Sequence, residues 1–154
     1  MDEHIAYMET AIQLALAQPR APFAALLVDH KSGATVATGL NDTRRNPLRH
    51  GEIDCIENAL ISLGKPNWSN LRLYTTAEPC CMCQSAILWC GIREVIFGTS
   101  VSTLRKLGWN QFDMTAQDVI DKTPFAQCSV IGGVSESRCD ALFTIAAELK
   151  GLTK

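Results

Sequence analysis

A two-part pattern of metal-ligating side chains constrains this chain more than any other feature. An H-x-E motif supplies His50 and Glu52, and a P-C-x-x-C motif supplies Cys80 and Cys83, with 26 residues between the two motifs. One imidazole and two thiolates would fill three corners of a zinc tetrahedron and leave the fourth corner open for water. The fold must therefore bring two separate segments together around one ion.

Glu52 is interpreted as a proton carrier, because the zinc site does not need it as a ligand. Zinc lowers the pKa of bound water from about 15.7 to about 7, and a neighbouring carboxylate can take and return protons. Two other hypotheses remain open, a structural Cys₃His zinc site and a metal-free redox C-x-x-C pair. Neither hypothesis gives Glu52 a purpose.

Both motifs are expected where a strand or loop meets the start of a helix, since unpaired N–H groups and the helix dipole favour thiolates there. Cys80 and Cys83 would share one face of the first turn. Cys81 would lie about 100° round the helix, so we predict that it is not a ligand. His50 and Glu52 would point apart on a regular helix, so a non-helical start or the metal must bring them together.

Composition favours one domain, spanning residues 1–154, with 47% hydrophobic and 19% charged residues. No apolar run reaches the roughly 18 residues of a membrane span, and the first residues do not resemble a signal peptide. We therefore expect a cytoplasmic protein with no membrane partner and reduced thiols. Four cysteines outside the motif are expected in the core: Cys55, Cys90, Cys128 and Cys139.

Hydrophobic periodicity and turn signals predict an α/β fold. Strands are expected at 23–28, 34–40, 71–76, 94–98 and 129–131, and helices near 3–17, 53–63, from 79 onward, near 101–107, near 115–121 and at 137–150. Ser137 is expected to be the N-cap of the last helix. Alternating strands and helices predict a three-layer α/β/α sandwich with a mixed five-stranded sheet, antiparallel in its opening hairpin and parallel later. The weakly patterned residues 99–127 would cap the pocket or serve an interface.

Beyond the ligands, the stretch from Phe23 to about Val101 resembles the cytidine-deaminase-like superfamily. It is similar to the branch that holds bacterial guanine deaminases, tRNA adenosine deaminases and fungal-type cytosine deaminases. The similar segments are Pro22-Phe23-Ala24-Ala25, Gly39-Leu40-Asn41, His50-Gly51-Glu52-Ile53, Thr76-Ala77-Glu78-Pro79-Cys80 and Cys83-Gln84-Ser85-Ala86-Ile87. The resemblance implies a Zn²⁺ cofactor, a cytidine-deaminase-like fold and hydrolytic deamination with release of ammonia. Glu52 would move the protons of that reaction.

The same resemblance implies roles for three residues around the substrate. Asn41 would hydrogen-bond the edge of the base, Phe23 would line the pocket, and Trp89 would help to shape the base site. The alternatives are ordinary core packing for the two aromatic residues and a turn role for Asn41.

One departure from the resemblance concerns the substrate. The segment 107–110 matches a Gly-Phe-Asp segment of guanine deaminases, and Asn110 stands where an acid is expected. An acid suits the N–H donors of guanine, whereas asparagine offers one donor group and one acceptor without charge. Asp113 is the nearby candidate to replace that acid.

We expect a purine nucleobase or nucleoside as substrate, guanine-type first, with adenosine in tRNA and cytosine as alternatives. Arg44, Arg45 and Arg49 could contact RNA, but a net charge of −2 and few cations on the last helix favour a small molecule over nucleic acid. The resemblance also implies a homodimer. A hypothesis from another class is an inactive, zinc-stabilised interaction subunit.

Overall fold

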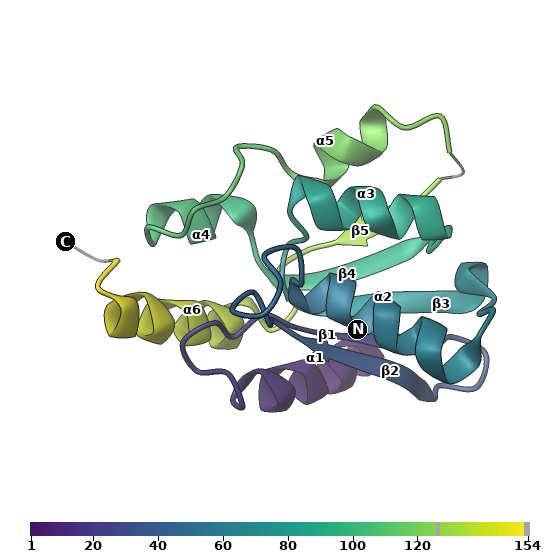
Figure 1. Ribbon diagram of the computed structural model, residues 1–154, viewed down its shortest axis with the longest axis horizontal. Helices are drawn as coiled ribbons and strands as arrows, with labels where there is room; N and C mark the ends of the chain where they lie inside the picture. Colours follow the sequence, from purple (N-terminus) through teal and green to yellow (C-terminus); the bar gives the residue numbers. More distant parts are fainter. Residues whose placement is uncertain (126, 153–154) are drawn as a thin grey trace.

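The fold is a five-stranded sheet between two layers of helices, seen in a computed structural model that describes residues 1–125 and 127–152 (Figure 1). The strands are β1 (Ala24–Asp29), β2 (Thr35–Leu40), β3 (Leu71–Ala77), β4 (Glu94–Thr99) and β5 (Ser129–Ile131). The helices are α1 (Asp2–Ala15), α2 (Gly51–Leu63), α3 (Cys81–Cys90), α4 (Val101–Lys106), α5 (Ala116–Asp121) and α6 (Glu136–Lys150), with a 3₁₀ turn η1 (Trp68–Asn70).

The sheet is mixed, as predicted. Its order is β2-β1-β3-β4-β5, and β1 runs antiparallel to both β2 and β3, whereas β3, β4 and β5 run parallel. Ala24 pairs with Leu40 and Ala77 with Thr99. The carboxyl ends of β2, β3 and β4 therefore lie at one edge of the sheet, together with the amino end of β1. The chain leaves β2 toward α2 and leaves β3 toward α3 at this same edge, and so the two motifs meet there.

Apolar side chains on both faces of the sheet hold the three layers together. On β1, Ala25 and Leu27 pack with α2 and α3, whereas Leu26 and Val28 pack with α1 and α6. A strand covered on both faces carries apolar residues without polar alternation. Figure 1 shows α1 and α6 on one side of the sheet and α2 and α3 on the other, with α5 beside α3.

The weakly patterned region contains the two short helices that were predicted. The Ser100 side chain caps α4, and Thr115 and Asp118 form a capping box at α5. The prediction for the last helix was wrong at its start: α6 begins at Glu136, with Ser135 as N-cap at a φ of 53°. Ser137 lies inside the first turn, because α6 begins before the first apolar residue of the pattern from which its start was predicted.

All seven cysteines are free, and Cys55, Cys128 and Cys139 are buried whereas Cys90 is half-buried. Burial in apolar surroundings raises the pKa of each of these four thiols. Within residues 1–125 and 127–152, no helix has both the length and the apolar character needed to cross a bilayer.

Candidate metal centre and active site

The three predicted ligands come together at the edge of the sheet. The Nδ1 atom of His50 lies 3.5 Å from Sγ of Cys80 and 3.6 Å from Sγ of Cys83. Possible ligand atoms of all three residues lie within 4.8 Å of one another, and neither Glu52 nor Cys81 belongs to the cluster.

These spacings fit a zinc ion. Zn–S bonds of about 2.3 Å and Zn–N bonds of about 2.0–2.1 Å at tetrahedral angles place the nitrogen and a sulfur about 3.6 Å apart. His50, Cys80 and Cys83 would therefore hold Zn²⁺ with little rearrangement. Among the described residues no fourth protein ligand joins them, which is the arrangement of catalytic sites and differs from a closed Cys₃His structural site.

The start of α2 places His50 and Glu52 on the same side. His50 is the N-cap, with extended backbone at φ −66° and ψ 163°, and the helix begins only at Gly51. Of the two explanations that the sequence left open, a non-helical start or the metal, the structure shows the non-helical start. Gly51 must lack a side chain, because a Cβ there would lie 2.6 Å from the carbonyl oxygen of Phe23.

The loop before α2 is tied to β2 by Asp54. Its carboxylate accepts hydrogen bonds from the backbone N–H of Leu40, at 2.9 Å, and from the guanidinium of Arg49, at 3.2 Å. A Cβ on Gly39 would collide with the backbone nitrogen of Cys55 and the carbonyl oxygen of Gly51. Close packing of β2 against α2 therefore fixes the position of the H-x-E motif.

The two thiols lie at the start of α3. Cys80 is its N-cap and Cys83 lies in the first turn, where backbone N–H groups lack helical partners. Hydrogen bonds from Cys83 and His50 lower the pKa of Cys80 to about 4. The hydrogen bond between Cys83 and Cys80, together with burial, raises the pKa of Cys83. The hydrogen bond with Cys80 raises the pKa of His50. Without metal the site favours one thiolate, and zinc binding would displace the proton of the other thiol.

Glu52 lies beside the cluster and is only 3% exposed. Burial, and then the nearby charge of Cys80, raise its pKa. The hydroxyl oxygen of Thr75 is 2.9 Å from Oε1 of Glu52 and 2.9 Å from the carbonyl oxygen of Ala77. A raised pKa and a hydroxyl partner suit a carboxylate that alternately takes and gives a proton.

A cavity of about 170 Å³ opens onto these groups, and we call it the site cavity. Its lining combines two residues of the metal cluster, His50 and Cys80, with aromatic, amide and charged side chains. The lining residues are Ala21, Phe23, Asn41, Thr43, His50, Glu52, Glu78, Cys80, Trp109, Asn110, Gln111 and Lys150. The amides offer both donors and acceptors, which is what the edge of a heterocyclic base requires.

Three predicted substrate residues line the site cavity: Phe23, Asn41 and Asn110. Phe23 also packs against Trp109, with ring centroids 5.2 Å apart at 88°. The Oδ1 atom of Asn41 accepts hydrogen bonds from the backbone N–H and the hydroxyl of Thr43, at 3.3 and 3.0 Å. The packing role of Phe23 and the turn role of Asn41 are therefore present together with their places in the cavity.

The structure does not bring Trp89 or Asp113 to the site cavity. Trp89 is 76% exposed and packs on Phe125 over a separate groove that Cys81 also lines. The helical repeat explains why Trp89 does not point to the site cavity. Trp89 follows Cys83 by six residues, which places it about 240° round α3 from that ligand. The Asp113 side chain is 82% exposed and pairs with Arg105 at 2.9 Å. Asp113 therefore lies outside the cavity wall that Asn110 lines.

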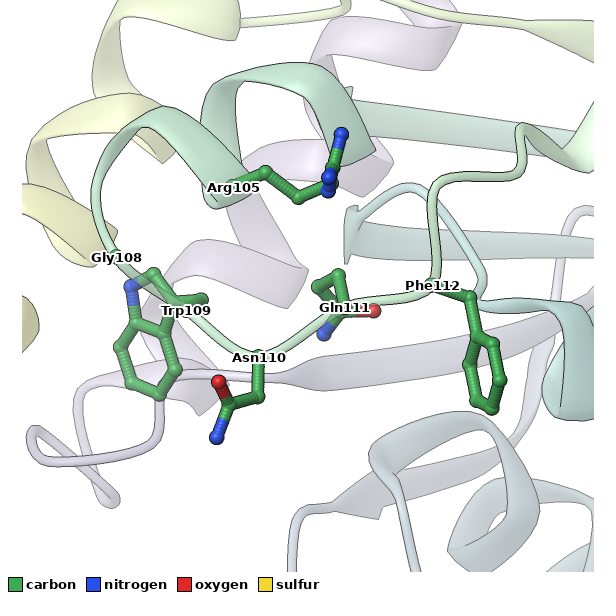
Figure 2. Close-up of a pocket in the computed structure, with 6 residues that line it drawn as sticks. All are labelled: Arg105, Gly108, Trp109, Asn110, Gln111 and Phe112. Carbon is green, nitrogen blue, oxygen red and sulfur yellow. The ribbon is translucent and has the colours of Figure 1, made fainter.

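Sequence reasoning missed six residues of the cavity wall: Ala21, Thr43, Glu78, Trp109, Gln111 and Lys150. Trp109 and Gln111 flank the predicted Asn110, so the loop after α4 was the available signal. Figure 2 shows this loop, where three cavity residues follow one another beside a surface depression of about 530 Å³. Lys150 ends α6, and its Nζ lies 4.9 Å from the centroid of the Trp109 ring. No local pattern marked Lys150.

Comparison with known proteins agrees with this geometry. Residues 1–99 match the family model described as the cytidine and deoxycytidylate deaminase zinc-binding region. The chain belongs to this family. It is thus a zinc-dependent deaminase, a hydrolytic enzyme.

Individual relatives differ in substrate. A probable cytosine deaminase of Schizosaccharomyces pombe is 33% identical over 109 residues, which are 69% of this chain and 66% of that protein. The guanine deaminase of Bacillus subtilis is 32% identical over 113 residues, which are 70% of this chain and 71% of that protein. The solved guanine deaminase of Nitrosomonas europaea has the same fold, with a TM-score of 0.82 at 23% identity over 94% of this chain and 84% of that chain.

Proposed function

We propose that this deaminase hydrolyses the exocyclic amino group of a guanine-type purine base or nucleoside and releases ammonia. The observation that carries the proposal is the buried Glu52 beside the cluster of His50, Cys80 and Cys83, which could hold a metal ion. Glu52, His50 and Cys80 line one cavity. His50, Cys80 and Cys83 would be the metal ligands, and Glu52 the catalytic residue.

The mechanism follows from the residues around the cavity. Zinc, when bound, would make water nucleophilic at neutral pH. Glu52 takes one proton of the attacking water and passes it to a ring nitrogen. It then carries the remaining proton of the added hydroxyl to the amino group, which leaves as ammonia. Thr75 holds the carboxylate in place for each transfer. Asn41 and Asn110 would hold the base edge, and Phe23 would pack against the ring.

The guanine-type substrate is supported by the relatives and by the cavity. One relative is a guanine deaminase, and solved neighbours were crystallised with 8-azaguanine and with 2,6-diaminopurine. The amides of Asn110 and Gln111 can accept from guanine N–H groups and donate to its carbonyl.

Cytosine and adenosine in tRNA are the alternatives. The relatives include cytosine deaminases and tRNA-specific adenosine deaminases. Asn110 at the position of the expected acid favours these alternatives, because that position then offers the guanine donors an uncharged amide in place of a carboxylate. Binding of tRNA that falls steeply with salt would select the RNA substrate.

The deciding experiment is ammonia release from guanine, guanosine, adenine, adenosine, cytosine and tRNA by the zinc-loaded protein. We expect guanine to have the highest kcat/KM. Glu52→Ala should keep one zinc per chain and lose turnover. Full zinc occupancy with no release from any of these compounds would instead favour the inactive interaction subunit.

We also propose that the protein is a cytoplasmic homodimer. Seven free cysteines suit a reducing compartment, and the exposed groove at Trp89 and Phe125 offers an apolar contact surface. Light scattering at twice the chain mass of 16.8 kDa would support the dimer, and cell fractionation tests the location.

A further inference from the structure

Glu78 is a buried acid that neither the metal nor the proton transfer uses. It follows β3, lies two residues before Cys80 and is only 6% exposed. Its Oε2 atom accepts a hydrogen bond from the backbone N–H of Val101, and its Oε1 atom accepts one from the backbone N–H of Ala116, each at 2.8 Å. One carboxylate therefore joins two segments that are 15 residues apart in the chain.

Both donors are the first residues of short helices. Val101 begins α4 and Ala116 begins α5, and the first N–H groups of a helix have no helical partner. The side-chain caps, Ser100 and Thr115, serve other N–H groups further into each helix. Helices of six residues are not stable alone, so their positions depend on such attachments.

The segment between the two attachments forms one wall of the site cavity. Trp109, Asn110 and Gln111 lie on the loop between α4 and α5 (Figure 2). All three also line the site cavity. Glu78 lines the same cavity, and its own backbone N–H donates to the carbonyl of Thr99 at 2.7 Å. A continuous series of contacts therefore connects the Cys80 ligand, through the nearby Glu78 carboxylate, to both ends of this wall.

We infer that Glu78 is a positioning residue, which holds the 101–116 wall at a fixed distance from the metal ligands and thereby sets how tightly the base is bound. This inference rests on the proposed function, because it takes the site cavity as the substrate pocket. Both oxygens of Glu78 are engaged by backbone donors, so the residue acts through the wall and leaves proton transfer to Glu52.

A carboxylate is required because both donors need an acceptor. In Glu78→Gln one oxygen becomes an NH₂ group, which would face a backbone N–H and cannot accept from it. The variant keeps the size and shape of the side chain, so it removes one attachment with little change in packing.

The experiment compares the zinc-loaded wild type with three variants. Glu78→Gln removes an acceptor, and Ala116→Pro removes one donor without altering Glu78 or the residues next to Cys80. Proline suits the first position of a helix, and Thr115 has the extended backbone that a following proline requires, at φ −81° and ψ 161°. Glu148→Gln, on the exposed side of α6, is the matched control.

Four quantities are measured: zinc content, amide hydrogen exchange in peptides covering 100–118, kcat for guanine and KM for guanine. For Glu78→Gln and Ala116→Pro we expect one zinc per chain, exchange faster by about tenfold, KM higher by about tenfold, and kcat within about threefold of wild type. Glu148→Gln should match the wild type throughout.

The inference is overturned by unchanged exchange, by faster exchange with unchanged KM, or by loss of zinc from Glu78→Gln, which would make Glu78 a support of the ligands. A misfolded Glu78→Gln leaves Ala116→Pro to decide. If the wild type does not deaminate guanine, the proposed substrate fails, while the exchange measurement still decides whether Glu78 fastens the wall.

Discussion

The hydroxyl of Thr75 serves Glu52 in both protonation states. Its oxygen lies 2.9 Å from Oε1 of Glu52 and 2.9 Å from the carbonyl oxygen of Ala77. When Glu52 is ionised, the hydroxyl donates to the carboxylate; when Glu52 is protonated, the hydroxyl accepts from it and donates to the carbonyl instead. A buried acid that keeps a partner in both states can exchange protons without leaving a polar group unpaired.

Thr75→Val should therefore lower kcat by about tenfold, the loss of one hydrogen bond to a charged group. The missing donor also destabilises the carboxylate, so the acidic limb of the pH–rate profile should move to higher pH. Thr75→Ser keeps the hydroxyl and should retain most activity. An unchanged acidic limb in Thr75→Val would contradict this role.

In the metal-free protein, the buried Glu52 should contribute less stability at neutral pH than in acid. Burial raises its folded pKa above the ordinary value of 4.5, so its stabilising contribution is complete below about 4.5 and is lost as pH rises through the folded pKa. Zinc-free Glu52→Gln lacks this loss and should gain stability relative to wild type as pH rises. Urea unfolding at pH 5 and pH 8 measures the difference, and Glu148→Gln should show none.

The C-x-x-C motif contains one cysteine that should be dispensable. Cys80→Ser and Cys83→Ser should bind far less than one zinc per chain, because each removes a thiolate from a three-ligand site. Cys81→Ser should keep full zinc and activity within about twofold, since Cys81 lies on another face of α3. Metal analysis by mass spectrometry decides, and zinc loss from Cys81→Ser would refute the assigned ligand set.

Because β2 packs closely against α2, adding a single methyl group at Gly39 should lower the free energy of unfolding. The added methyl of Gly39→Ala would meet backbone atoms of Gly51 and Cys55, which cannot rotate away. We expect a loss of about 1–3 kcal/mol in the free energy of unfolding, together with weaker zinc binding. Thr38→Ala, exposed on the same strand, should change stability by no more than about 0.5 kcal/mol.

Asn110→Asp tests the substrate assignment. A carboxylate in the cavity wall would accept from the N–H groups of guanine, so kcat/KM for guanine should rise by about tenfold. Asp113→Asn should have no effect, because Asp113 pairs with Arg105 outside the cavity. A fall in guanine turnover in Asn110→Asp would show that the amide reads the substrate edge directly.

The sequence by itself determined the chemistry of the centre and most of the frame. His50, Cys80 and Cys83 were recognisable because zinc accepts few side-chain types and because helix starts are marked by local residues. The strands and helices followed from apolar periodicity, including the mixed sheet and the two short helices near 101 and 115. Such features depend on interactions between neighbours in the chain.

Only the tertiary structure decided which residues line the site cavity. Helical rotation places Trp89 on a different face of α3 from Cys83, and Asp113 is exposed and forms an ion pair with Arg105. Lys150 lines the cavity although it lies near the C-terminal end of the sequence. Glu78 accepts hydrogen bonds from Val101 and Ala116, which are 23 and 38 residues further along the chain. A cavity wall assembled from such distant segments leaves no periodic trace in the sequence, because its contacts are set by the packing of whole elements.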